Sequence, residues 1–297
     1  MIDGDTQLVG LLGWPVEHSL SPVMHNAVFD ALGLNWRYLP LPVRPGQIEI
    51  AVSGLVSLGF RGANVTVPHK QAVMPMLDTL TPGAKELGAV NTLLIRRDHD
   101  QAPAVAGHNT DSQGFIDALR QSGFRPGAGS KVVLVGAGGA ARAVIFGLLR
   151  SGINEIVVLN RDAERARTLV SDLRQNAADP SRPAALPLTP ETLVESARAA
   201  DLLVNATTVG MWPRVEESIW PERVAIPSYL TVFDLVYNPL ETRLLRQTRA
   251  SGACGVDGLG MLVRQGALAL DLWTEMGLDV DELSNWMRKA CDQVLRR

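Results

Sequence analysis

The sequence predicts an α/β fold, and this prediction depends on two observations. Apolar runs of strand length alternate with segments of helical periodicity along most of the chain, which is typical of parallel sheets covered by helices. The chain has 297 residues, 46% of them hydrophobic, which is enough for about two domains that each bury a core. The expected strands lie at residues 6–13, 36–43, 62–67, 89–95, 131–138, 155–160, 201–207 and 230–236.

Two breaks in this pattern indicate where the domains divide. Residues 98–113 are rich in polar and turn-forming residues, and a second break, RPGAGSK, precedes the strand expected at 131–138. We therefore expect an N-terminal α/β domain over residues 1–110 and a Rossmann-type, doubly wound parallel sheet over residues 111–257. The C-terminal helices, over residues 258–297, are expected to return to the first domain and complete it.

Local signals mark the ends of particular helices. Ser21 followed by Pro22 is a typical helix start with Ser at the N-cap, and Gly33 is a typical stop. Near the end of the chain, Asp279 and Glu282 resemble a capping box that opens a final helix.

Composition and charge exclude several classes of function. The 28 basic and 31 acidic residues give a net charge of -3, which provides no long-range attraction for nucleic acid or an anionic membrane. No leader pattern and no apolar run of roughly 18 residues is found, so we expect a cytoplasmic protein. Cys254 and Cys291 lack ligand spacing, so neither a disulfide nor a metal site is expected. Small-molecule chemistry is therefore favoured.

The segment KVVLVGAGGAAR predicts a dinucleotide site. Gly136, Gly138 and Ala141 fit the G-x-G-x-x-G/A fingerprint directly after a β-branched strand and at the start of a helix. Gly136 allows the tight turn, and Gly138 lets the backbone approach a pyrophosphate, which the helix amides then bind. The residues expected to bind the cofactor phosphates are Gly136, Ala137, Gly138, Gly139 and Ala140.

The end of the next expected strand favours NADP over NAD. An NAD site usually has Asp or Glu at this position, whereas here Asn160 is followed by Arg161 and Arg165. Two guanidinium groups suit a 2′-phosphate, because a planar cation can bind it bidentately. Asp162 opposes this interpretation, because it adds a negative charge beside the same pocket.

Polar clusters at expected strand ends predict a substrate site. Ser19 and Ser21 flank a helix start, where free amides favour an anion such as a carboxylate. Thr66 and Lys70 follow the strand expected at 62–67, and open α/β sheets bind ligands at such ends. Two further polar clusters lie at residues 89–92 and 107–112.

With these motifs in their order, the chain resembles the shikimate dehydrogenase family over essentially its whole length. The resemblance is carried by HSLSP, GANVTVPHK, GAVNTL, NTD, GAGGAAR, NAT and DGLGMLVRQ. It implies NADP-linked interconversion of 3-dehydroshikimate and shikimate in aromatic amino-acid biosynthesis. The domain over residues 1–110 would then be the substrate-binding domain, and the one over residues 111–257 the NADP-binding domain.

The resemblance also implies roles for individual residues. Lys70 and Asp111 correspond to the catalytic pair, and Ser19 and Ser21 to the pair that holds the substrate carboxylate. The other implied substrate-binding residues are Thr66, Asn91, Tyr237 and Gln265. The implied cofactor-binding residues beyond the glycine-rich turn and the arginines are Asn205, Ala206, Thr207 and Gly258.

The chemistry requires an acid–base group within hydrogen-bond reach of the reacting oxygen, and Lys70 is our candidate. Desolvation favours the neutral amine and Asp111 favours the ammonium, so the sequence leaves their balance open. His18, His25, His69 and His108 are weaker candidates, because none belongs to the catalytic motif that the resemblance supplies.

Two alternatives to an NADP-dependent shikimate dehydrogenase stay open. One is a quinate/shikimate dehydrogenase that uses NAD, against which Ser19, Ser21 and Asn160 argue. The other is a non-catalytic nucleotide-binding sensor on the same fold, against which the presence of both Lys70 and Asp111 argues. The sequence does not distinguish a monomer from a homodimer.

Overall fold

The computed structural model of the chain describes residues 2–98, 102–176 and 183–295. The chain divides into two compact units, the first formed by Met1–Asp111 with Val263–Arg297 and the second by Ser112–Leu262. The C-terminal segment thus belongs to the first unit. The limits of these units lie near the residues where we expect the functional domains to divide, and the functional division itself remains a prediction.

The first unit contains a mixed sheet. Its strands are β1 (Gln7–Gly13), β2 (Trp36–Pro42), β3 (Gly62–Val65), β4 (Thr79–Leu80), β5 (Thr92–Arg96) and β6 (Ala104–His108), in the spatial order β2-β1-β3-β5-β6-β4. β1 runs parallel to β2 and β3, but β5 runs antiparallel to both β3 and β6. The expectation of parallel strands is therefore wrong for β5.

Part of the polar stretch at 98–113 is a strand. β6 pairs with β5 along its whole length and buries Val105 and Gly107. A Cβ atom on Gly107 would lie 2.6 Å from the Leu77 side chain and 2.8 Å from that of Leu80, so these side chains would have to move to admit a larger residue. Val105 is the one residue of AVAGH with a strong strand propensity, so pairing with β5 decides the structure of this segment.

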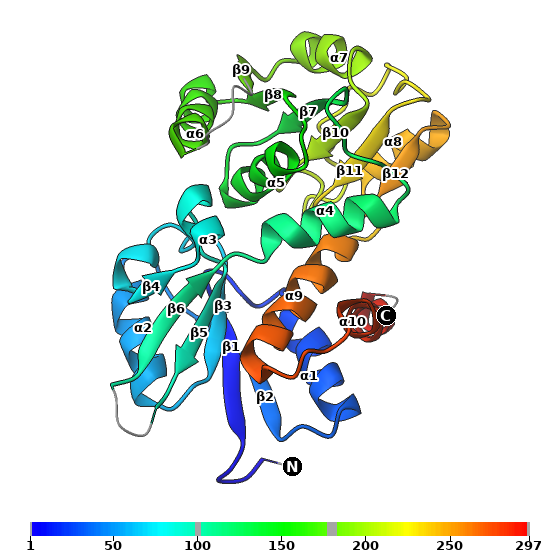
Figure 1. Cartoon of the computed structure of the whole chain (residues 1–297). Coiled ribbons are helices and arrows are strands. Elements are labelled where there is room, and N and C mark those ends of the chain that lie inside the picture. The colour runs from blue at the N-terminus through cyan, green and yellow to red at the C-terminus, as the bar shows by residue number, and fades with distance from the viewer. Residues whose placement is uncertain (1, 99–101, 177–182, 296–297) are drawn as a thin grey trace. The chain divides into compact units, whose positions relative to one another are not determined.

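Helices cover both faces of the first sheet (Figure 1). They are α1 (Ser21–Ala31), α2 (Ile48–Ser57), the 3₁₀ turn η1 (Met74–Met76), α3 (Pro82–Leu87), α9 (Leu259–Thr274), which begins in the second unit, and α10 (Val280–Leu295). α2 and α3 bury Val52, Leu55 and Ala84 against Leu12 and Val65 of the strands. α1 packs with α10 on the opposite face.

The expected N-cap of α1 is wrong by one residue. Leu20 occupies the N-cap position with helical backbone angles, and Ser21 is the first helical residue. The Ser19 hydroxyl instead accepts a hydrogen bond from the Ser21 amide, at 3.2 Å. At the start of α10, the Asp279 half of the expected capping box is confirmed, because Asp279 Oδ1 accepts from the amide of Glu282, at 3.2 Å.

The second unit is a doubly wound parallel sheet. Its strands are β7 (Lys131–Val135), β8 (Glu155–Asn160), β9 (Ala184–Pro187), β10 (Leu202–Asn205), β11 (Thr231–Asp234) and β12 (Cys254–Val256), in the order β12-β11-β10-β7-β8-β9, with all neighbours parallel. This order reverses between β7 and β10, which is where such sheets bind dinucleotides. The Rossmann-type prediction is confirmed.

Alternation along β7 explains why this sheet is covered on both faces. Val132 and Leu134 pack into one core cluster, whereas Val133 and Val135 pack into another. The helices of the unit are α4 (Asp111–Gln121), α5 (Gly139–Arg150), α6 (Ala163–Asn176), α7 (Pro190–Arg198) and α8 (Arg243–Ala250). α4, α5 and α6 contribute to the first cluster, and α7 and α8 to the second.

Neither a membrane span nor a metal site is found in the described part of the chain. Over residues 2–98, 102–176 and 183–295, every helix is too short or too polar to cross a bilayer. The same residues contain no group of at least three His, Cys, Asp or Glu side chains placed to hold a metal ion.

Candidate active site

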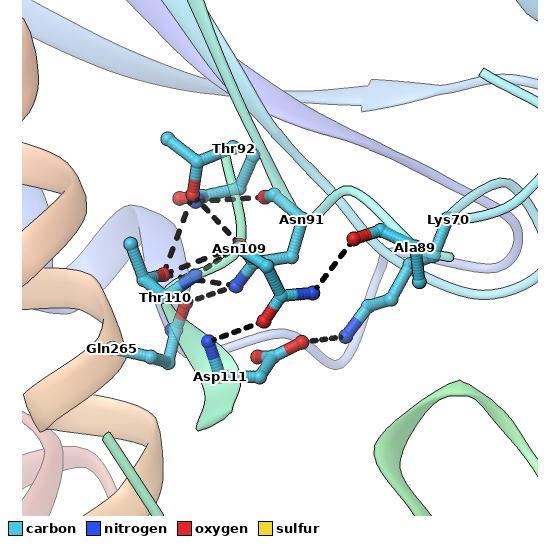
Figure 2. Close-up of polar contacts among 9 residues, drawn as sticks. Lys70, Ala89, Asn91, Thr92, Asn109, Thr110, Asp111 and Gln265 are labelled. Atoms are coloured by element: carbon cyan, nitrogen blue, oxygen red, sulfur yellow. Dashed lines mark hydrogen bonds and ion pairs between the residues drawn. The ribbon is translucent and has the colours of Figure 1, made fainter. Parts of the chain in front are cut away.

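Lys70 and Asp111 form a close ion pair at one edge of the first sheet (Figure 2). Lys70 Nζ lies 2.6 Å from Asp111 Oδ2, and the two side chains are only 15% and 8% exposed. Lys70 lies in the loop after β3, and Asp111 opens α4 three residues after the end of β6. The structure thus brings together two residues that are 41 positions apart in the sequence.

The antiparallel strand β5 explains how this edge collects its residues. β3 and β6 end at the same edge, and because β5 runs the other way, its start lies there too. The loops 66–70, 89–91 and 109–111 are therefore neighbours. The Val90 amide donates to the Lys70 carbonyl, at 2.8 Å, which holds the lysine loop against the start of β5.

His69 anchors the lysine loop and is not placed for proton transfer to a ligand. It is 1% exposed, and its Nε2 donates to the carbonyl of Val43, at 2.7 Å. His25 is fully buried in α1 and stacks on Tyr38, with ring centroids 4.3 Å apart. Burial lowers the pKa of His25 to about 3, so this ring stays neutral. Neither histidine competes with Lys70 for the acid–base role.

Asn109 ties the segment that carries Asp111 to the loop before β5. Its Nδ2 donates to the carbonyl of Ala89, at 3.0 Å, and its Oδ1 accepts from the amide of Asp111, at 3.1 Å (Figure 2). Val90 is hydrogen-bonded to Lys70, and Ala89 is hydrogen-bonded to Asn109, two residues before Asp111. Residues 89–90 therefore position both members of the ion pair. Sequence reasoning did not identify Asn109.

Asn91 and Gln265 meet in the same region. Asn91 Nδ2 donates to Gln265 Oε1, at 3.3 Å, although the two residues are 174 positions apart (Figure 2). Asn91 Nδ2 also donates to the Thr110 hydroxyl, at 2.9 Å, and Asn91 Oδ1 accepts from the Thr110 amide, at 2.8 Å. Both predicted residues are buried, and the C-terminal helix α9 supplies the second of them.

Ser19, Ser21 and Thr66 lie near the ends of the parallel strands β1 and β3, also at this edge. The amide of Thr66 donates to the carbonyl of Leu12, at 2.8 Å. A Cβ atom on Gly13 would lie 2.3 Å from Thr66 Cγ2, so the close approach of Thr66 to β1 requires glycine there. Ser21 is 5% exposed, and Ser19 and Thr66 are half-buried.

In the second unit, the glycine-rich turn has the conformation that the fingerprint requires. Gly136 has φ +118, and a Cβ atom there would lie 2.9 Å from the carbonyl oxygen of Ala206. Gly138 is different, because a Cβ atom on it would meet nothing within 4 Å. The protein's own packing therefore does not require glycine at 138. α5 begins at Gly139 without a side-chain cap, so its first amides can bind an anion.

The segment after β8 presents basic groups. Asn160 Nδ2 donates to the carbonyl of Asp162, at 2.8 Å, and Asp162 Oδ1 accepts from the amide of Arg165, at 3.2 Å. Asp162 therefore acts as a cap at the start of α6, and the side chains of Arg161 and Arg165 are exposed. This arrangement fits the phosphate of a 2′-phosphorylated nucleotide.

A buried carboxylate organises the ends of β10 and β11. Asp234 accepts from Asn205 Nδ2, at 2.9 Å, and from the Thr242 hydroxyl, at 2.6 Å. Asn205 Oδ1 in turn accepts from the Thr207 hydroxyl, at 2.7 Å. Burial raises the pKa of Asp234 to about 6, and its hydrogen bonds oppose the rise. Sequence reasoning identified Asn205 and Thr207, but not Asp234 or Thr242.

Two further predicted residues lie at this edge of the second sheet. Tyr237 is half-buried in the loop after β11. Gly258 is buried, and a Cβ atom on it would lie 2.2 Å from the carbonyl oxygen of Leu235, so the backbones approach closely there. Packing alone accounts for glycine at 258.

Fold and site together define a two-unit α/β protein of the nucleotide-dependent dehydrogenase class. Residues 11–93 match the model of the shikimate dehydrogenase substrate binding domain, and residues 118–218 match that of shikimate / quinate 5-dehydrogenase. The chain belongs to the shikimate dehydrogenase family.

Individual relatives agree with this assignment over nearly the full length. The chain is 47% identical to the shikimate dehydrogenase (NADP(+)) of Methanopyrus kandleri, covering 99% of this chain and 98% of the relative. It is 46% identical to that of Moorella thermoacetica, covering 97% and 95%. The crystal structure of shikimate 5-dehydrogenase from Thermus thermophilus in complex with NADP(H) and shikimate matches with TM-score 0.81 and 37% identity, covering 96% and 99%.

Proposed function

We propose that this protein is an NADP-dependent shikimate dehydrogenase, which reversibly reduces 3-dehydroshikimate to shikimate in aromatic amino-acid biosynthesis. The observation that carries the proposal is the ion pair of Lys70 and Asp111 beside Asn91 and Gln265, in a chain of this family. A nucleotide sensor has no need of an acid–base pair.

Lys70 is the proton donor in this proposal. Reduction adds a hydride to the ketone carbon and a proton to the ketone oxygen, and NADPH supplies the hydride when bound. The ammonium of Lys70 polarises the carbonyl and donates the proton to its oxygen; in the oxidative direction, the amine accepts the proton of the hydroxyl. Asp111 orients the Lys70 ammonium through their 2.6 Å contact.

The remaining first-unit residues bind and orient the substrate. Ser19 and Ser21 bind the carboxylate, helped by the amides at the start of α1. The hydroxyl and amide groups of Thr66, Asn91 and Gln265 bind the ring oxygens. Tyr237, which the resemblance implies as a substrate-binding residue, remains a prediction.

The second unit holds NADP in this proposal. The backbone of residues 136–140 binds the pyrophosphate, and the open space beside Gly138 supports this role. Arg161 and Arg165 bind the 2′-phosphate, and Asn160 shapes the turn that carries them. The other proposed cofactor-binding residues are Asn205, Ala206, Thr207 and Gly258, and Ala206 and Thr207 lie beside Gly136 of the turn.

A cofactor-by-substrate assay tests the proposed function. Purified protein is incubated with shikimate or quinate and with NADP+ or NAD+, and reduced nicotinamide is followed by its absorbance. We expect the highest kcat/KM with shikimate and NADP+. A preference for quinate or NAD+ would favour the alternative dehydrogenase, and no reduction with any pairing would favour the sensor. The cytoplasmic location, the absence of a nucleic-acid partner and the monomeric or homodimeric state remain predictions.

A further inference from the structure

The side-chain amide of Asn91 has a fixed polarity. Its Oδ1 accepts from the Thr110 amide, at 2.8 Å, and from the Thr92 hydroxyl, at 3.0 Å (Figure 2). Its Nδ2 donates to the Thr110 hydroxyl, at 2.9 Å, and to Gln265 Oε1, at 3.3 Å. If the amide turned over, Nδ2 would face the Thr110 backbone amide, which can only donate, and that hydrogen bond would be lost. Asn91 therefore presents its N–H groups, not its carbonyl oxygen, towards Gln265.

A chain of hydrogen bonds from the interior sets the direction of the Thr92 hydroxyl. Asn64 Nδ2 faces the backbone carbonyl of Asn91, which can only accept, so Asn64 Oδ1 lies towards Tyr38 Oη and accepts from it, at 2.9 Å. This Nδ2 donates to Thr92 Oγ1, at 3.1 Å. The Thr92 hydroxyl has one proton to donate, and Asn91 Oδ1, at 3.0 Å, is a closer acceptor for it than Thr110 Oγ1, at 3.4 Å.

The residues of this series of hydrogen bonds are buried. Tyr38, Asn64 and Thr92 are 1%, 4% and 0% exposed, so solvent does not compete for their polar groups. Asn64 Nδ2 also donates to the backbone carbonyl of Asn91, at 3.2 Å, which ties the backbone of Asn91 to β3. In the hydrogen bonds that link Tyr38, Asn64, Thr92 and Asn91, each donor thus meets an acceptor.

We propose that Asn64 and Thr92 are positioning residues that fix the orientation of the substrate-binding amide of Asn91. This proposal rests on the proposed function, in which Asn91 binds a ring oxygen of shikimate. Asn64 and Thr92 act through Asn91 and need not touch the substrate. The consequence is that Asn91 offers an N–H group to a ring oxygen that accepts hydrogen bonds, in exchange for its 3.3 Å hydrogen bond to Gln265 Oε1.

Two substitutions at one position test the proposal. Thr92→Val removes the hydroxyl but keeps the β-branched shape that suits a buried strand, and Thr92→Ser keeps the hydroxyl. We expect Thr92→Val to raise the KM for shikimate about fivefold, the size expected for one lost hydrogen bond, with little change in kcat or in the Kd of NADP+ measured by fluorescence. Thr92→Ser should restore the wild-type KM. Equal KM values in wild type and Thr92→Val would overturn the proposal.

A double-mutant cycle separates positioning from a general structural effect. If Thr92 acts through Asn91, Thr92→Val should have no further effect on shikimate binding, measured by calorimetry, in an Asn91→Ala background. Additive losses would overturn the proposal. Asn64→Leu removes another hydrogen bond of the same series, the one from Asn64 to Thr92. Like Thr92→Val, it should raise the KM for shikimate.

A measurement without substrate keeps this inference distinct from the proposed function. The side-chain amide protons of Asn91, followed by NMR in the full-length protein, should exchange with solvent faster in Thr92→Val than in wild type or Thr92→Ser. Equal exchange rates in these three proteins would overturn the positioning role of Thr92, even if the wild type oxidises shikimate. Faster exchange in Thr92→Val, with no oxidation of shikimate by the wild type, would support the positioning role of Thr92 and refute the proposed function.

Discussion

The two units fix the loops at their sheet edges with different chemistry. In the first unit, the neutral side-chain amides of Asn91 and Asn109 hold the segment that carries Asp111, and a backbone hydrogen bond from Val90 holds Lys70. In the second unit, a glycine-rich turn presents backbone amides, and Arg161 and Arg165 present exposed charges. The first arrangement holds side chains in place for a chemical step. The second leaves backbone amides and guanidinium groups open to hydrogen-bond a ligand.

Removing the amine of Lys70 should have the largest effect. We expect Lys70→Ala to lower kcat by about a thousandfold with much less effect on the affinity for shikimate, because the ammonium donates the proton in the transition state. Steady-state kinetics with shikimate and NADP+ measure both quantities, and Lys70→Arg serves as a control that keeps the charge. Equal losses in kcat and in affinity would refute the acid–base role.

A pair of glycine substitutions contrasts ligand binding with folding in the second unit. Gly138→Ala should leave the melting temperature unchanged, because its Cβ has open space, but should weaken NADP+ binding by about a hundredfold through a clash with the pyrophosphate. Gly136→Ala should lower the melting temperature, because φ is +118 there and Ala206 lies close. The comparison fails if Gly138→Ala binds NADP+ as tightly as the wild type in fluorescence titrations.

The exposed arginines should change cofactor preference rather than catalysis. We expect Arg161→Gln with Arg165→Gln to raise the Kd for NADP+ about tenfold and leave the Kd for NAD+ nearly unchanged, since only NADP+ carries the 2′-phosphate. Asp162→Asn is a matched variant that keeps an oxygen to cap α6 and removes the charge, and it should tighten NADP+ binding slightly. Parallel losses for both cofactors would contradict the assignment of the arginines.

Asp234 should give the smallest effect, seen as a pH dependence of stability. Its folded-state pKa of about 6 lies above the ordinary 3.8, so the folded protein holds this proton more tightly than the unfolded chain. The resulting stabilisation is present below about pH 4 and is lost as the pH rises through about 6. Urea unfolding at about pH 4.5 and pH 7.5 should show a dependence on the order of 1 kcal/mol that is absent in Asp234→Asn. Identical pH profiles for the two proteins would show that Asp234 is not the responsible group.

Much of the fold and of the cofactor site could be predicted because the signals are local. The turn at Gly136, the cap at Asp279 and the basic pair after Asn160 each depend on residues within a few positions of one another. The substrate residues came from the resemblance to a family and not from spacing. The strand β6 was missed because AVAGH has no strand pattern until it pairs with β5.

The sequence by itself determined the alternation of strands and helices and the dinucleotide turn, and its resemblance to a family supplied the proposed acid–base pair. Only the tertiary structure decided that β5 runs antiparallel, and this direction brings residues 66–70, 89–92 and 109–111 to one edge. It also decided that Asn64 and Thr92 orient Asn91 and that Asp234 joins Asn205 to Thr242. The physical reason is range: backbone conformation and periodicity are set by neighbours in the chain, whereas the partner of a buried polar group is set by which strands lie side by side.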